Sequence, residues 1–241
     1  LSVRARMLLN IFSKYALFIF SPVVNTYRNR NKCRFPWGIV KVYQFREQTG
    51  NFSYLIMCEA SGKAAVIDPS PETADRIAEL SLAKLGIECV INTHRHSDHT
   101  SGNRTMVSQF RCKLITSAIE AKHVPGVDKV IADNEVLMIG SVKLQFLLMP
   151  GHTPGSICVL ANENHLFTGD TLFIGDCGRT DLPGGSNADM FRTMQRLKSL
   201  HDSLTIYPGH DYGDKACDTL GNQKKSNKCL MAKNLSEFTR I

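Results

Sequence analysis

The chain has 241 residues, enough for one large domain, and its 43% hydrophobic content is ordinary for a protein with a substantial buried core. The net charge of +7 belongs to one end: residues 1–34 hold seven of the 29 basic residues and no acidic one, which leaves 22 basic against 22 acidic residues in the rest. This neutral body lacks a basic face with interleaved aromatic residues, which argues against a nucleic-acid partner.

Residues 1–36 are predicted to form a basic amino-terminal extension. Arg4 and Arg6 precede a mostly apolar run, Met7 to Val24, which is too interrupted by polar residues for a membrane span. Three interpretations stay open for this arm. It is an organellar targeting segment of the mitochondrial type, a surface anchor that contacts a membrane, or a disordered extension.

The rest of the chain, 37–241, is predicted to be a single domain with a short carboxyl-terminal tail. Ser70-Pro71 predicts the start of a helix with proline at its first position, and Gly86 ends the helical spacing of apolar residues. Ile87–Asn92 reads as a buried strand. Turn residues separate the three strand-like runs that come first, Ile39–Phe45, Tyr54–Cys58 and Ala64–Ile67.

A second β-rich half follows. Ser186 predicts a helix start, with Asp189 three residues later as in a capping box. The predicted strands of this half are Val136–Met149, Ile157–Ala161, Leu166–Phe167 and Leu204–Tyr207. Two β-rich halves, each with its own helices, predict an α/β (α+β) protein in which two sheets pack together under outer helices.

Histidine and aspartate gather in four short motifs. The segment INTHRHSDHT at 91–100 places three histidines and an aspartate within six positions, where protonated imidazoles would repel one another unless a cation lies among them. MPGHTPGS (149–156), FTGDTLF (167–173) and IYPGHDYG (206–213) each add one residue after an apolar strand, beside a glycine. The seven candidate metal ligands are His94, His96, Asp98, His99, His152, Asp170 and His210.

The types of donor narrow the choice of metal. Imidazole and carboxylate suit zinc, iron or manganese, and the lack of cysteine donors argues against a closed structural zinc site. Seven ligands are too many for one four-coordinate ion, so we expect two divalent ions, with zinc preferred and iron or manganese as alternatives. Two ions about 3.5–4 Å apart can hold a hydroxide and polarise a carbonyl or phosphoryl oxygen.

These motifs resemble those of the metallo-β-lactamase-fold hydrolases, and among them the glyoxalase II-like (hydroxyacylglutathione hydrolase-like) group. The matching stretches are T-H-x-H-x-D-H at 93–99, P-G-H-T-P-G at 150–155, G-D-T-L-F at 169–173, C-G-R-T-D-L-P-G-G at 177–185 and Y-P-G-H-D-Y-G at 207–213. The resemblance covers residues 38–230. It implies an αββα four-layer sandwich with a dinuclear centre in a cleft at one edge.

The resemblance also implies a role for each ligand. The first ion would be held by His94, His96 and His152, the second by Asp98, His99 and His210, and Asp170 would bridge them. Arg179 and Tyr212 are candidate substrate contacts; a structural ion pair and a packed phenol are the alternatives for these two residues.

The function expected from this resemblance is hydrolysis of a thioester or ester, with a hydroxyacylglutathione-type thioester as the leading substrate. Metal-bound hydroxide would attack the carbonyl, and Asp98 would be the catalytic residue that orients it. The alternative is a mononuclear iron persulfide dioxygenase of the same fold, with iron on His94, His152 and Asp170. A non-enzymatic metal-binding protein is a third possibility.

The cysteines indicate the compartment. Eight of them lie far apart without a C-x-x-C pair, which indicates free thiols in a reducing compartment and makes the cytoplasm the expected location. Cys177, which a Gly-Arg turn follows, is interpreted as a packing residue. The expected partner is a small-molecule substrate, glutathione-linked or not. Only 31 residues follow His210, whereas the glutathione-thioester hydrolases of this family carry a longer helical domain there.

Overall fold

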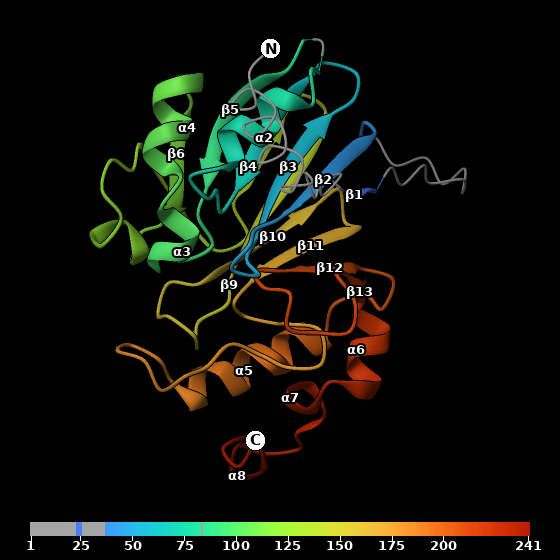
Figure 1. Cartoon of the computed structure of the whole chain (residues 1–241). Helices are drawn as coiled ribbons and strands as arrows, with labels where there is room; N and C mark the ends of the chain where they lie inside the picture. Colours follow the sequence, from blue (N-terminus) through green and yellow to red (C-terminus); the bar gives the residue numbers. More distant parts are fainter. Residues whose placement is uncertain (1–22, 26–36, 83) are drawn as a thin grey trace, which may run out of the picture.

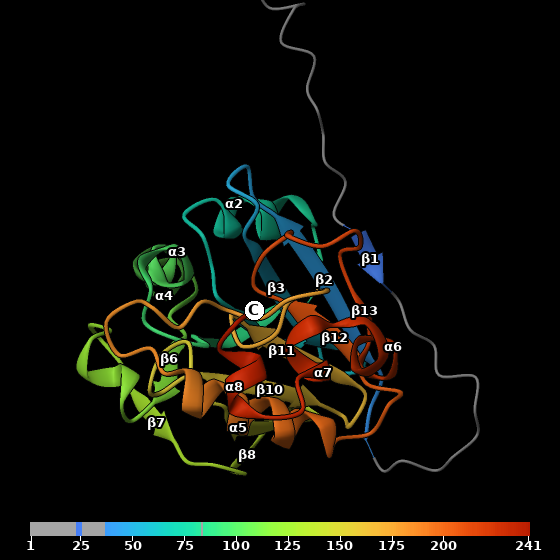
Figure 2. The same cartoon turned by 90° about the horizontal axis from the view of Figure 1, so that it is seen from below.

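Two β-sheets lie face to face, and helices cover their outer surfaces (Figure 1). The structure is a computed structural model that describes residues 23–25, 37–82 and 84–241. Viewed from below, α2 lies on one side of the paired sheets and α5 on the other (Figure 2).

The first sheet is antiparallel from β1 to β4 and parallel from β4 to β7. In spatial order its described strands are β1 (Val23–Asn25), β2 (Val40–Arg46), β3 (Phe52–Cys58), β4 (Lys63–Ile67), β5 (Gly86–Ile91), β6 (Lys113–Ser117) and β7 (Lys129–Ile131). The strand order therefore equals the chain order.

The second sheet is antiparallel except for the parallel pair β11 and β12. Its order is β13 (Asp218–Thr219), β12 (Thr205–Pro208), β11 (His165–Gly169), β10 (Ile157–Ala161), β9 (Val142–Leu148) and β8 (Val136–Ile139).

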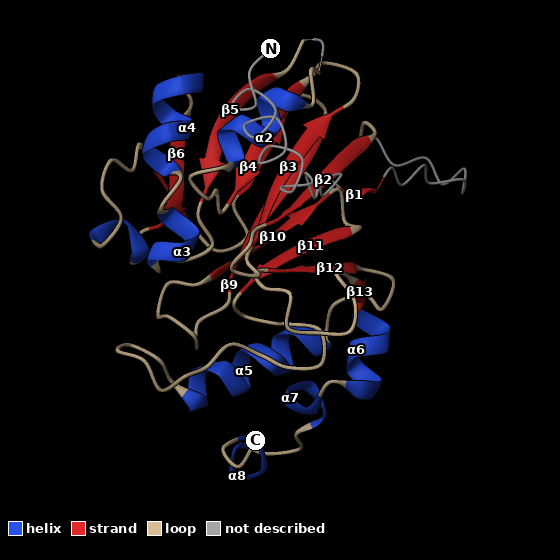
Figure 3. Cartoon of the chain, in the orientation of Figure 1, coloured by secondary structure: helices blue, strands red, loops and turns tan. Residues whose placement is uncertain are grey.

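The helices divide between the two outer faces (Figure 3). Beside the first sheet lie α2 (Thr73–Glu79), α3 (Ser97–Thr100), α4 (Asn103–Phe110) and the 3₁₀ turn η1 (Glu120–Lys122). Beside the second lie α5 (Asn187–Lys198), α6 (Leu220–Ser226), α7 (Lys228–Met231) and α8 (Leu235–Phe238).

Buried apolar side chains form three clusters, one at each interface between layers. One cluster joins the inner faces of the two sheets, and the other two join each sheet to its helices. Three interfaces require four layers, so the predicted αββα sandwich is confirmed. Within the central cluster Tyr54 packs edge-on against Phe167 and Tyr207, and such pairs contribute about 0.5–1.5 kcal/mol each beyond their buried area.

The helix predicted from Ser70 to Gly86 is shorter than expected. It begins at Thr73 with Glu72 at its N-cap, so Pro71 precedes the helix and the predicted start is wrong. It ends at Glu79, because Ser81 and Lys84 adopt the left-handed backbone conformation, with φ of 47° and 64°. The predicted strand Val136–Met149 is a hairpin of two strands, which turns at Gly140 where φ is 59°. The predicted helix start is confirmed: Ser186 Oγ accepts a hydrogen bond from the amide of Asp189 at 3.2 Å.

Part of the predicted amino-terminal extension joins the sheet. Val23–Asn25 pairs antiparallel with β2, with Val23 opposite Gln44 and Asn25 opposite Val42. The remaining residues of the extension, and with them the targeting and anchor hypotheses, lie outside the described residues, so the domain boundary at residue 36 stays a prediction. No helix in the described part of the chain is long and apolar enough to span a bilayer.

Because β1 contributes only three residues at the edge of the first sheet, we expect its loss to be tolerated. A chain shortened to begin at Phe35 should keep its metal content. Its melting temperature should fall by no more than about 4 °C, since a net loss near 1 kcal/mol corresponds to about 2–4 °C in a protein of this size. Calorimetry of the two chain lengths measures this, and a fall well beyond 10 °C would mean that the arm is part of the core.

Candidate metal centre

The candidate ligands follow strands whose carboxyl ends meet at one edge of the two sheets. His94, His96 and the short helix α3 come directly after β5, His152 follows β9, Asp170 follows β11, and His210 follows β12. In open α/β sheets, ligands bind outside the carboxyl ends of the strands. The structure thus brings all seven residues together from four separate segments.

Six of them form two compact groups of three, which a third group of Asp68, His94 and His99 joins. His94, His96 and His152 form one group, and Asp98, His99 and His210 form the other; within each, the potential ligand atoms lie within 4.8 Å of one another. In the first group His96 Nδ1 is 2.9 Å from His152 Nε2. In the second, His99 Nε2 is 3.3 Å from His210 Nε2.

Asp170 lies between the two groups. Its Oδ2 is 3.6 Å from His152 Nε2 and 3.2 Å from His210 Nε2, and its Oδ1 is 3.2 Å from His99 Nε2. The carboxylate therefore reaches donors of both groups at once. This is the position that a carboxylate bridging two ions would take.

The spacing of the imidazole nitrogens fits metal ions. Nitrogen lone pairs that face each other at about 3 Å repel unless a proton or a cation lies between them. Tetrahedral ligands with metal–nitrogen bonds of about 2.0–2.1 Å lie roughly 3.3 Å apart. His94 Nε2 is buried and has no hydrogen-bond partner, which is costly for a polar atom unless it serves as a ligand.

Burial and neighbouring charges shift the pKa of two candidate ligands in the direction that suits metal binding. Burial and the charge of His99 lower the pKa of His94 well below its ordinary value, so its imidazole is neutral and can donate a lone pair. Burial alone would raise the pKa of Asp170. The charge of His99 and the hydrogen bonds from His210 and His99 together outweigh burial and hold the pKa of this carboxyl well below its usual range. Asp170 is therefore ionised, as a carboxylate that binds a metal must be.

Asp68 orients the site, although the sequence motifs did not identify it. Its Oδ2 lies 3.0 Å from His99 Nδ1, while its two carboxylate oxygens accept hydrogen bonds from the amide and hydroxyl of Thr93, the residue before His94. A carboxylate on the far nitrogen of a ligand histidine fixes the tautomer and the ring orientation. The available signal was an aspartate directly after the buried strand β4.

Two other buried residues support the ligand loops. Asn51 Nδ2 donates to Asp98 Oδ2 at 2.9 Å. Glu120 accepts from the amides of Arg95 and Gly155, both at 2.9 Å, and so ties the histidine cluster to the loop of His152. Neither side chain stands in a motif, so sequence inspection could not identify them.

Close packing explains one of the glycines beside the ligands. A Cβ at Gly209 would overlap Asp170 Oδ1 and come within 2.9 Å of His99 Cε1. Only glycine, which has no Cβ, lets the backbone before His210 pass this close to the Asp170 carboxylate. The sequence argument for glycine beside the ligands therefore has a steric basis here.

The two candidate substrate contacts lie at the exposed side of the site. Arg179 forms a bidentate ion pair with Asp181, at 2.7 Å for both contacts, while its carbonyl oxygen accepts a hydrogen bond from His152 Nδ1 at 2.7 Å. The ring of Tyr212 stacks on His210, with centroids 4.7 Å apart and planes 4° apart, and 65% of the residue is exposed. Arg179 thus forms the ion pair, and Tyr212 the ring packing, that were the alternatives to substrate contact. A substrate role for either residue stays a prediction.

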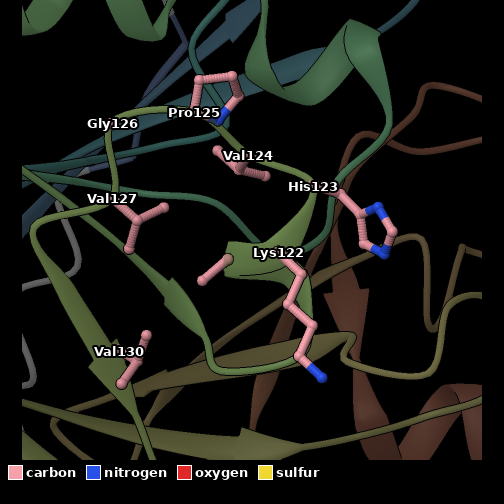
Figure 4. Close-up of a pocket in the computed structure, with 8 residues that line it drawn as sticks. Lys122, His123, Val124, Pro125, Gly126, Val127 and Val130 are labelled. Carbon is pink, nitrogen blue, oxygen red and sulfur yellow. The ribbon is translucent and has the colours of Figure 1, made fainter.

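A separate pocket of about 410 Å³ is formed by η1, the segment after it and β7, and Figure 4 shows its lining side chains. Residues 121–127 and Val130 line it. None of the seven candidate ligands, nor Arg179 or Tyr212, contributes to it. It is therefore no part of the metal centre.

Known proteins are similar in sequence to this chain. The family model of the metallo-beta-lactamase superfamily matches residues 47–210. Hydroxyacylglutathione hydrolase of Rhodospirillum rubrum is 36% identical over 172 residues, covering 71% of this chain and 66% of that protein. Probable hydroxyacylglutathione hydrolase of Schizosaccharomyces pombe is 34% identical over 195 residues, with 78% and 72% covered. The chain thus spans about two thirds of the length of these curated relatives.

Solved structures agree with the fold. A metallo-beta-lactamase from Staphylococcus aureus is 30% identical with a TM-score of 0.76, over 83% of this chain and 65% of that one. The crystal structure of ETHE1 from Myxococcus xanthus is 29% identical, also with a TM-score of 0.76, over 83% and 88%. The family expected from the motifs is confirmed, and that family binds metal ions. This chain belongs to the metallo-beta-lactamase superfamily, and its curated relatives are of the glyoxalase II type.

Proposed function

We propose that this protein is a metal-dependent hydrolase of thioesters, with a hydroxyacylglutathione-type substrate. The observation that carries the proposal is the division of six ligands into two groups of three, with the Asp170 carboxylate between them. The printed names of the relatives from Rhodospirillum rubrum and Schizosaccharomyces pombe supply the substrate class.

We propose two divalent ions for this site, zinc in the first place and iron or manganese as alternatives. His94, His96 and His152 would hold one ion, Asp98, His99 and His210 the other, and Asp170 would bridge them. When bound, two such ions lower the pKa of a water molecule and polarise a carbonyl oxygen. Three of the five histidines, His94, His99 and His152, are almost fully buried, which favours rigid placement of the ions.

The chain's own residues supply orientation. Asp98 is the most exposed of the seven, with 46% of its side chain accessible, and Asn51 fixes its Oδ2. Its carboxylate therefore faces both the ions and the approaching substrate, where it can accept a hydrogen bond from the attacking nucleophile. We assign it this catalytic role.

Tyr212 and Arg179 are proposed to contact the substrate. The stacked Tyr212 ring offers an apolar face at the entrance, and its hydroxyl can donate a hydrogen bond. Arg179 can bind a carboxylate of the glutathione moiety if it exchanges its exposed partner Asp181, since surface ion pairs contribute only about 0–1 kcal/mol. A reducing compartment such as the cytoplasm fits the unoxidised thiols of Cys177 and Cys229.

A substrate panel tests the function. The protein purified without added metal is analysed for zinc, iron and manganese, and is then assayed with a 2-hydroxyacyl glutathione thioester, an acetyl thioester of a simple thiol, an ester and a β-lactam. We expect about two ions per chain and a kcat/KM for the glutathione thioester at least about 100-fold above the others, a selectivity that requires roughly 2.7 kcal/mol. Equal rates for both thioesters would refute glutathione recognition, and no thioester hydrolysis would refute the hydrolase.

A further inference from the structure

A second cluster of reactive side chains lies outside the metal centre. Asp176, Cys177 and Cys229 place one ligand-type atom each within 4.8 Å of one another. Cys177 follows β11 in the loop that leads to Arg179, whereas Cys229 lies in α7, which packs against α5 (Figure 1). Both cysteines are free thiols, so two sulfur atoms from distant parts of the chain face each other in reduced form.

The two thiols differ in access to solvent. Cys177 is half-buried, whereas Cys229 is 1% exposed and belongs to the cluster under α5. The hydrogen bond with Cys177, together with burial, raises the pKa of Cys229, so Cys229 remains a protonated thiol. A dissolved oxidant therefore reaches Cys177 first.

Backbone and side-chain contacts hold the two segments together. Asn227 Nδ2 donates to the carbonyl oxygens of Phe173 and Asp176, at 3.1 and 2.9 Å, while its Oδ1 accepts from the amide of Cys229 at 2.9 Å. One side chain thus fixes the loop before Cys177 and the first turn of α7. The two sulfur atoms lie within 4.8 Å of each other, so a modest rearrangement of the loop at Cys177 would bring them to the disulfide bond length of about 2.05 Å.

The contacts of Asp176 argue against metal binding by this cluster. Asp176 Oδ1 accepts from the Cys229 thiol at 3.3 Å and from the amide of Cys177 at 2.8 Å, and its Oδ2 pairs with Lys228 at 2.8 Å. Both carboxylate oxygens are engaged, and the ammonium of Lys228 opposes a cation. The chemistry of the pair therefore favours oxidation over metal binding.

We propose that Cys177 and Cys229 form an oxidative modification site at which a peroxide joins them in a disulfide. The Cys177 thiolate attacks one peroxide oxygen, which breaks the O–O bond, leaves a sulfenic acid on Cys177 and releases hydroxide. The Cys229 thiol then attacks the Cys177 sulfur and gives its proton to the departing hydroxide, so that the S–S bond forms, the S–O bond breaks and water leaves. The two sulfur atoms lose two electrons in total, and the peroxide is reduced to hydroxide and water.

The position of the pair connects it to the metal centre. The residue after Cys177 is Gly178, where a Cβ would overlap the carbonyl oxygen of Asp170. The next residue is Arg179, whose carbonyl oxygen accepts from His152. The disulfide would therefore fasten the carboxyl-terminal segment to the loop that orients two of the candidate ligands.

Peptide mass spectrometry tests the proposal. The metal-loaded full chain is treated with hydrogen peroxide, blocked with an alkylating reagent and digested without reductant. We expect a Cys177–Cys229 peptide pair, about 2 Da lighter than the two separate thiol peptides, which dithiothreitol resolves. No such pair, or Cys177 recovered only as sulfinic acid, would overturn the proposal.

Three variants assign the roles. Cys229→Ser should accumulate sulfenic acid at Cys177, which dimedone traps, whereas Cys177→Ser should leave Cys229 unmodified because peroxide does not reach it. Cys217→Ser, which alters another half-buried cysteine, is the matched control and should keep the cross-link. If Cys177→Ser instead lowers the bound zinc by one equivalent and the wild type forms no cross-link, the cluster is a metal site and the proposal is wrong.

Discussion

Asp170→Ala is expected to lose both metal ions. The Asp170 carboxylate lies 3.2–3.6 Å from nitrogens of both histidine groups, so its removal takes a ligand from each ion at once. It also leaves clustered imidazoles without the buried negative charge that balances bound cations. We expect bound metal to fall from about two ions per chain to below about 0.2, and hydrolysis to fall by more than about 1000-fold, which goes beyond the 10–100-fold loss typical of groups around the ligands.

Metal analysis after gel filtration measures this directly. Asp202→Ala is the matched control and should keep both ions. Asp202 is an exposed aspartate paired with Lys224, and it precedes β12, whereas the candidate ligand His210 follows that strand. Circular dichroism shows whether each variant is folded. Retention of one tightly held ion by folded Asp170→Ala would contradict the bridging position.

His210→Ala in the zinc-loaded protein is expected to reduce thioester hydrolysis by more than about 1000-fold while the first ion stays bound. His210 belongs to the second group only; its Nε2 is 3.3 Å from His99 Nε2 and 3.4 Å from Asp98 Oδ2. Losing it should release the second ion, and with it one of the two charges that activate the nucleophile. The measurements are kcat for the glutathione thioester and the zinc content of the same protein sample.

The same variant separates the hydrolase from an iron-dependent dioxygenase. A dioxygenase would need one iron on His94, His152 and Asp170, so His210 would act only at a distance and its loss would cost about 10–100-fold. We expect no oxygen uptake by the iron-loaded protein with glutathione persulfide. Oxygen consumption that survives His210→Ala within two orders of magnitude would instead establish the dioxygenase. His201→Ala is the control, because His201 is exposed and its ring forms hydrogen bonds with Ser203, two residues later.

Local pattern alone was enough for the family, the layers and the candidate ligands. His94, His96 and His99 lie so close in sequence that any fold would keep them together. His152, Asp170 and His210 each stand beside a glycine after an apolar strand, so chain geometry delivers them to a strand end. The helix at Ser186 was also predictable, since its capping hydrogen bond spans three residues. Such features depend on residues only a few positions apart, so a short stretch of sequence is enough to predict them.

Only the tertiary structure decided which distant residues support the centre. Ile67 pairs with Ile91 in the parallel ladder of β4 and β5, and this register carries Asp68 to the Thr93 amide and the His99 ring. Cys177 and Cys229 meet because α7 packs below the second sheet, although 51 residues separate them. Strand register and helix packing depend on burial summed over the whole core, which no short window of sequence contains.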